Sequence, residues 1–143
     1  MTTTFRADAR AGLYGVLTGF MAANGTMLRS AHRVRPEGFT GDYPIGFVDL
    51  LPESIGHTQG VRTRTMTPSV VIVGEYRLNG EHVDDFDVVV DTFLDYCTAI
   101  PHIVTGTIWD RMTVEDYDET IGEQLRPAVR FTFGNLSIQE GRT

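Results

Sequence analysis

The sequence predicts one α+β domain spanning residues 1–143: a mixed, mainly antiparallel β-sheet flanked by two main helices, in the order α-β-β-β-α-β-β. Two patterns predict this class. Residues 70–73 form the unbroken apolar run Val-Val-Ile-Val, which is typical of a strand buried on both faces. Residues 83–97 then place apolar side chains three and four positions apart, which is the spacing of an amphipathic helix. A chain of 143 residues can bury the core of a single domain.

Composition narrows the class of protein further. Hydrophobic residues make up 41% of the chain and charged residues 22%, as in ordinary globular proteins. No window approaches the roughly 20 apolar residues of a membrane-spanning helix, and the N-terminus lacks the apolar segment of a secretory signal. Cys97 is the lone cysteine and lies on the apolar stripe of a helix, as a buried structural thiol does. We therefore expect folding in a reducing cytoplasm and no membrane partner.

A threonine N-cap at position 3 or 4 begins the first helix, which runs to about Ala23 before an Asn-Gly pair ends it. Gly12, Gly15 and Gly19 lower the intrinsic stability of this helix. The spacing of Gly15 and Gly19, four residues apart, either allows the close approach of another element or reflects low propensity alone.

Three segments after this helix are predicted as strand, strand and loop. Residues 27–34 alternate between polar and apolar side chains and predict a strand with a basic face, which carries Arg29 and Arg33. A Gly- and Pro-rich connection follows, and residues 45–51, apolar on both sides, predict the next strand. Residues 52–60 show little periodicity and predict a mobile loop.

A further strand is predicted just before the buried run. Residues 61–67 resume the alternation, with Arg62 and Arg64 on one side. Pro68 cannot donate a hydrogen bond to a sheet, so it marks a bulge or the start of the buried strand 69–75.

An Asn-Gly turn leads into the second helix, whose first turns are rich in aspartate, as the helix dipole favours, and Pro101 ends it. Further strands are predicted at 103–110 and 128–135. Between them, residues 112–124 predict a projecting acidic arm or a long hairpin. The acidic residues of this segment are Glu115, Asp116, Asp118, Glu119 and Glu123. The tail from about residue 139 is expected to fray.

Titratable residues fall into no catalytic or metal-binding pattern. The four histidines lack the spacing of a zinc site, so His32 is expected in the core and His57 at the surface. Four aspartates share the helix face opposite the apolar stripe, which predicts a solvated face or, alternatively, a weak divalent-ion site at a subunit boundary. These are Asp84, Asp87, Asp91 and Asp95. The sequence carries no phosphate-binding glycine motif and no nucleophile motif, so it favours a non-enzymatic protein without cofactor or metal.

The net charge of −7 argues against nucleic-acid binding, which normally needs a basic surface. It is compatible with DNA that moves along the protein without binding to it. The basic strand faces and the acidic helix and hairpin segments form complementary patches. Copies with such patches can join head to tail and close into a ring. The alternative is that these charges are unrelated solvated residues.

Three stretches carry a family resemblance: RTRTMTPSVVIVGEY at 62–76, VDDFDVVVDTFLDYCTAIP at 83–101 and LRPAVRFTFGN at 125–135. With the order of elements, they resemble the tail terminator (tail completion) proteins of long-tailed bacteriophages, especially minor tail proteins from phages of actinobacteria. The resemblance spans residues 5–136. It implies a structural virion protein that forms a hexameric ring at the head-proximal end of the tail, after assembly in the host cytoplasm.

The resemblance also implies partners and contact residues. The ring ends polymerisation of the tail tube protein and offers a surface to the head-tail connector protein, while DNA passes through the channel without sequence-specific binding. Residues 52–60 and 112–124 would contact neighbours or the tube. The candidate interface residues are Arg29, Arg33, His57, Arg62, Arg64, Glu115, Asp116, Asp118 and Glu119. A head completion (stopper) protein, or a small α+β enzyme or ligand-binding domain, is the alternative.

Overall fold

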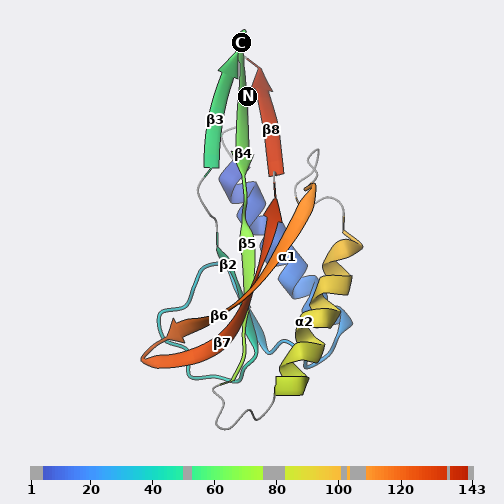
Figure 1. Cartoon of the computed structure of the whole chain (residues 1–143), viewed down its shortest axis with the longest axis vertical. Coiled ribbons are helices and arrows are strands. Elements are labelled where there is room, and N and C mark those ends of the chain that lie inside the picture. The colour runs from blue at the N-terminus through green and yellow to red at the C-terminus, as the bar shows by residue number, and fades with distance from the viewer. Residues whose placement is uncertain are drawn as a thin grey trace.

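The computed structural model describes residues 5–49, 53–75, 83–100, 103, 109–134 and 136–141. Within these residues, α1 (Phe5–Ala23) and α2 (Val83–Thr98) pack on one face of a five-stranded sheet (Figure 1). The strands of this sheet, in spatial order, are β1 (Ser30–His32), β2 (Ile45–Asp49), β5 (Ser69–Val73), β7 (Gln124–Gly134) and β6 (Arg111–Ile121). Only the β1–β2 pair in this sheet is parallel. The predicted α+β class, with a mixed and mainly antiparallel sheet and two helices, is confirmed.

A second sheet projects from one end of this body along the long axis of the molecule (Figure 1). It consists of β3 (Glu53–Thr58), β4 (Val61–Met66) and β8 (Leu136–Gly141), with β4 in the middle, and we call it the β-arm. In the chain, β3 follows β2, β4 precedes β5 and β8 follows β7. The β-arm therefore prolongs three neighbouring strands of the main sheet.

The main core lies between the helices and the sheet. Phe20 of α1 and Phe93 of α2 meet edge to face, with ring centroids 5.1 Å apart, and Phe93 meets Phe131 of β7 at 4.8 Å. All residues of β5 are buried, as its apolar run predicts. The opposite face of the sheet is covered as well, because Phe47 and its neighbours pack with aromatic residues of the loop that precedes β2.

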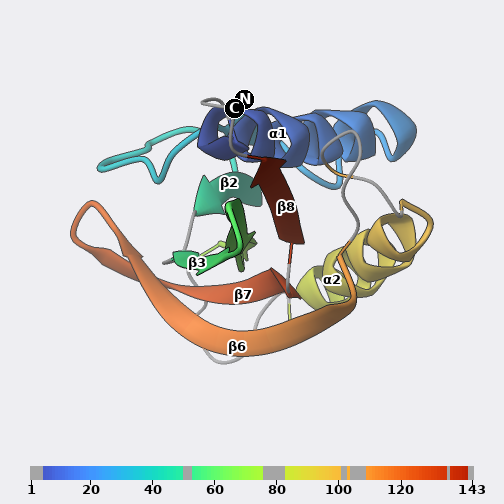
Figure 2. The ribbon, with the colours of Figure 1, turned by 90° about the horizontal axis from the view of Figure 1, so that it is seen from above.

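β6 and β7 form a long curved hairpin whose turn lies at the end away from α2 (Figure 2). Gly122 supplies the positive φ of 64° in this turn. Its amide donates a hydrogen bond of 2.8 Å to the carbonyl of Glu37, so the turn curls back onto the loop that follows β1. Of the two structures predicted for residues 112–124, the hairpin is the one that forms.

The prediction of a mobile loop at residues 52–60 is wrong for most of this segment, because residues 53–58 form β3. Gln59 and Gly60 join β3 to β4 with positive φ values of 50° and 82°, as a tight two-residue hairpin turn requires. The strand escaped prediction because most of its described side chains are exposed, so no apolar alternation marks it. The Gln-Gly pair was the local signal.

The prediction of a frayed tail from residue 139 is also wrong, because residues 139–141 belong to β8 and pair with residues 61–63 of β4. This pairing joins segments far apart in the sequence, and a local pattern cannot reveal it. The strand predicted at 103–110 lies mostly outside the described residues. Its last two residues precede β6 without strand structure.

The two glycines of α1 that could admit a neighbour behave differently. A Cβ added at Gly19 would meet the hydroxyl of Tyr96 on α2, whereas a Cβ at Gly15 would meet open space. Gly19 therefore allows the close approach of Tyr96 to α1, whereas Gly15 has no such neighbour. Gly12 provides another close approach, because a Cβ there would collide with the backbone carbonyl of Ile103.

This contrast gives a matched pair of variants. We expect Gly15→Ala to raise the free energy of unfolding by about 0.5–1 kcal/mol, because alanine is the better helix former. Gly12→Ala should lower it by about 1–3 kcal/mol, because a backbone carbonyl cannot easily move away. Urea denaturation of both variants measures the two shifts, and shifts of the same sign would contradict the packing at Gly12.

Candidate functional site

The base of the β-arm is fixed by apolar packing and by an ion pair. The apolar cluster consists of Phe5, Ala9, Met66 and Leu136, all buried. Beside it, Arg64 of β4 donates two hydrogen bonds to the carboxylate of Glu53 on β3, from Nε to Oε2 and from Nη2 to Oε1, both 3.1 Å long. The Arg64 guanidinium also lies 5.2 Å from the ring centroid of Phe5. These contacts join the β-arm to the start of α1.

Arg64 therefore binds within its own chain. The side chains of Arg64 and Glu53 are both largely buried, and Arg6 of α1 adds a longer contact of 3.4 Å to the same carboxylate. The sequence offered Arg64 as a contact to a neighbouring subunit. Its charge is instead compensated by Glu53, and its position supports the orientation of the β-arm.

This ion pair makes the stability of the protein depend on pH. The two hydrogen bonds from Arg64 hold the pKa of Glu53 below its ordinary value of 4.5. A carboxyl group with a lowered pKa in the folded state adds stability above its unfolded pKa and loses it as the pH falls through the folded value. We expect Glu53→Gln to lower the melting temperature at neutral pH, and the difference from the natural protein to shrink at pH below 4.5. Glu123→Gln, at the exposed hairpin turn, is the control, and a pH-independent difference for Glu53→Gln would contradict the assignment.

His57 and Arg62 lie opposite each other on β3 and β4, farther along the β-arm than Arg64. His57 is exposed, as predicted, and Arg62 is half-buried. Since side chains alternate along a strand, both lie on the side of the β-arm that also carries Ile55 and Arg64. The basic face predicted for residues 61–67 is therefore present on the β-arm.

Arg29 and Arg33 flank β1, at one edge of the main sheet. Both side chains are exposed, and the guanidinium of Arg33 lies 5.6 Å from the ring centroid of Tyr14. The predicted arginines thus form two separate groups, one beside β1 and one on the β-arm. His32, expected in the core, is half-buried and exchanges a hydrogen bond of 3.0 Å with Ser30.

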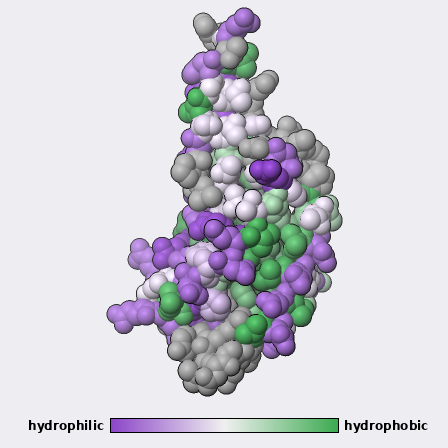
Figure 3. Space-filling model, viewed as in Figure 1, coloured by the Kyte–Doolittle hydropathy of each residue, from purple (hydrophilic) through white to green (hydrophobic). Residues whose placement is uncertain are grey.

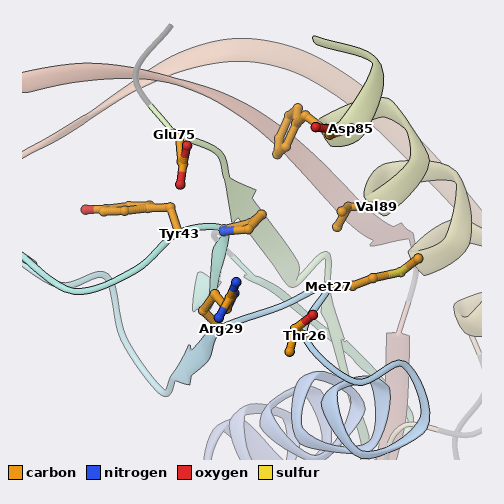
Figure 4. A pocket seen from close by; sticks show the side chains of 9 residues that line it. Thr26, Met27, Arg29, Tyr43, Glu75, Asp85 and Val89 are labelled. Atoms are coloured by element: carbon orange, nitrogen blue, oxygen red, sulfur yellow. The ribbon is translucent and has the colours of Figure 1, made fainter. Parts of the chain in front are cut away.

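A cavity of about 230 Å³ opens beside Arg29. Figure 4 shows Asp85 and Val89 of α2 on one side of it, with Arg29 and Thr26 across the space. Its lining mixes apolar side chains with charges of both signs. The volume is below the roughly 300 Å³ at which ligand pockets begin, so this cavity is a weak candidate for a small-molecule site.

The acidic residues of the predicted projecting segment differ in exposure. Glu115, Asp116 and Asp118 on β6 are exposed. Glu119 is only 8% exposed, because its carboxylate pairs with Arg35 at 2.9 Å and accepts a hydrogen bond of 2.6 Å from the hydroxyl of Tyr117. Burial and this hydrogen bond raise the pKa of Tyr117. The prediction of Glu119 as a surface contact is therefore not supported, since its side chain closes the hairpin onto the loop after β1.

A network of polar side chains on the face of the main sheet away from the helices was not predicted. Arg130 of β7 donates hydrogen bonds of 2.7 Å to the carboxylate of Asp49 and to the hydroxyl of Ser69. Its guanidinium also lies 5.4 Å from the ring centroid of Tyr117. Each residue comes from a different strand, so only the occurrence of Ser69 and Arg130 within apolar strands hinted at this network.

The four aspartates of the predicted helix face, Asp84, Asp87, Asp91 and Asp95, are all exposed on α2. Across the described residues, no group of three or more His, Cys, Asp or Glu side chains is arranged to hold a metal ion. Their exposure agrees with the predicted solvated face, and the alternative of an ion site at a subunit boundary stays a prediction. His82 and His102 lie outside the described residues.

Comparison with models of known protein families gives no match, and neither does comparison with curated protein sequences. The resemblance to tail terminators therefore stays a prediction. Among the described residues, no helix has the length and apolar character needed to cross a membrane.

Proposed function

We propose that this chain is a structural protein of phage tail assembly that forms a ring at the head-proximal end of the tail tube. There it ends polymerisation of the tube protein and provides the surface for joining the head. The proposal combines the family resemblance with one structural observation, the β-arm that projects from the body (Figure 1). No catalytic step or cofactor is part of this function.

The β-arm has the properties of a contact element. Beyond its base, most of its described side chains are exposed or half-buried, and these include the apolar residues Ile55 and Val61. A sheet gains independent stability by burying a hydrophobic face. A β-arm that exposes such side chains gains stability when a partner covers them.

The distribution of charge supports association between copies. The exposed carboxylates of β6 lie on the body, and Arg62 lies on the β-arm. A contact between two different surfaces of the same molecule is heterologous, and it generates a ring when the rotation between copies closes. Such a ring suits a protein that caps a tube.

Electron microscopy of the purified protein mixed with tail tubes tests the proposal. We expect rings at one end of each tube, and overlong tubes when the protein is missing during assembly. Tails of normal length that fail to join heads would instead identify a stopper protein. A protein that stays monomeric and never caps a tube would overturn the proposal.

The charge assignment gives a separate prediction. We expect Arg62→Glu to weaken ring formation in light scattering only in part, because ion pairs near the surface are worth about 0–1 kcal/mol each. Arg64→Glu should lower the melting temperature as well, since it places a carboxylate against that of Glu53. Ring formation unchanged by Arg62→Glu and by added salt would count against the assignment.

A further inference from the structure

The β-arm has an open edge on each side. Within the described residues, β3 and β8 pair with β4 and no strand continues this sheet past either of them. Figure 1 shows the β-arm projecting clear of the body, with β3 on one side of β4 and β8 on the other. An edge strand carries a row of backbone N–H and C=O groups without a partner strand, which makes it a template for pairing with another chain.

The edges of the main sheet are protected against pairing with a further strand. Natural proteins protect such edges by keeping the strand short or by placing charged side chains on it. β1 has only three residues. β6 is longer but carries the exposed carboxylates of Glu115, Asp116 and Asp118. A strand added beside β6 would have to approach these charges.

The two edges of the β-arm lack this protection. β3 and β8 have six residues each, which is the usual length of a strand. Each has one carboxylate and no arginine or lysine. Arg64 compensates Glu53 of β3, and Arg62 lies opposite Glu140 of β8 in the strand register. Figure 3 shows pale, weakly polar residues along the middle of the β-arm, whereas strongly hydrophilic residues gather on the body.

The turn between β3 and β4 determines which backbone groups of β3 face outward. Across this two-residue turn, Thr58 and Val61 form a hydrogen-bonded pair. Along an antiparallel ladder, hydrogen-bonded pairs alternate with pairs that lack these bonds. The backbone N–H and C=O groups of Ile55 and His57 therefore point away from β4, towards the open edge.

β8 presents the matching edge. The same alternation directs the backbone groups of Ser137 and Gln139 away from β4. β3 and β8 both run antiparallel to β4, so they run in the same direction. β3 of one copy placed beside β8 of another would form a parallel pair, in which both strands offer free N–H and C=O groups at alternate residues.

We propose that β3 of one copy pairs with β8 of the next copy, so that the β-arms join into one continuous sheet. This inference rests on the proposed function, because it names the two edges that the ring would join. The edges lie on opposite sides of each β-arm, so the contact is heterologous and repeats from copy to copy in one direction. Closure of the ring leaves no edge of a β-arm unpaired, as in a closed barrel. Pairing of β3 with β3 would instead join two copies and leave both β8 edges open.

A proline at an outward-facing position tests this contact, because it removes an N–H from the open edge and none from the ladder between β3 and β4. We expect His57→Pro to weaken self-association in light scattering by about tenfold or more, since main-chain hydrogen bonds supply the affinity of an added strand. His57→Ala removes the same side chain but keeps the N–H, so it should associate at least about tenfold more tightly than the proline variant. Equal weakening in the two variants would assign the contact to the His57 side chain and overturn the inference.

Amide hydrogen exchange in the natural protein tests the contact without a substitution. The outward-facing amides of Ile55 and His57 on β3, and of Ser137 on β8, should gain protection when rings form. The amide of Gly56, which faces β4 within each copy, should change less. Rings in which the outward-facing amides stay unprotected would overturn this inference and leave the proposed function standing. A natural protein that neither associates nor caps tubes would overturn the proposed function itself.

Discussion

Phe131→Ala is expected to lower the free energy of unfolding by about 3–5 kcal/mol, which is the usual cost of removing a buried aromatic ring. The Phe131 side chain is fully buried on β7, and its ring contacts that of Phe93 on α2. Its loss leaves a cavity between α2 and the sheet, which the surrounding strands can fill only in part. Urea denaturation followed by circular dichroism measures the change.

The same strand pair supplies the control. Val114 lies directly opposite Phe131 in the register, yet its side chain is exposed on the edge strand. Val114→Ala should change the free energy of unfolding by no more than about 0.5 kcal/mol, as surface substitutions usually do. Comparable losses for the two variants would show that the helix-facing core is not organised around Phe131.

Met66→Ala is expected to lower the free energy of unfolding by about 2–5 kcal/mol and to loosen the β-arm selectively. Met66 ends β4, pairs with Leu136 at the start of β8, and is fully buried at the base of the β-arm. Amide hydrogen exchange should show lost protection in β3, β4 and β8, while β5 and β7 keep theirs, because the apolar cluster at the base is separate from the main core.

Met112→Ala is the matched control for this variant. It removes the same side chain from a half-buried position on β6, which packs on the main core rather than on the base of the β-arm. It should leave the exchange of the β-arm unchanged. Uniform loss of protection across both sheets in Met66→Ala would mean that the β-arm and the body unfold as one unit.

The part of the fold that buries apolar surface could be predicted from the sequence. The run in β5 and the stripe of α2 follow from periodicity, and the Asn-Gly pair after α1 ends it with a positive φ of 62° at Gly25. Most of the β-arm could not be predicted, because β8 pairs with β4 across about half of the chain and β3 has almost no apolar pattern. Only β4 showed the alternation of a strand.

The candidate site residues show the same contrast between what a local segment predicts and what only the folded chain determines. Charges that remain at the surface, such as Asp116 and Asp118, could be assigned from their segment alone. The intrachain partners of Arg64 and Glu119 could not be predicted, because each pairs with an opposite charge, Glu53 or Arg35, that only the folded chain brings close. Composition gives the number of charges, whereas strand register decides which of them neutralise one another.

The continuity of the two sheets has a mechanical consequence. Thr67 and Pro68 alone separate β4 from β5, so the β-arm has no flexible linker at its central strand. A pull on the β-arm along its length loads the hydrogen bonds of neighbouring strands in shear, and these bonds share the force. A pull across its length bends the β-arm against the cluster at its base. We therefore expect the connection between the β-arm and the main sheet to resist tension better than bending.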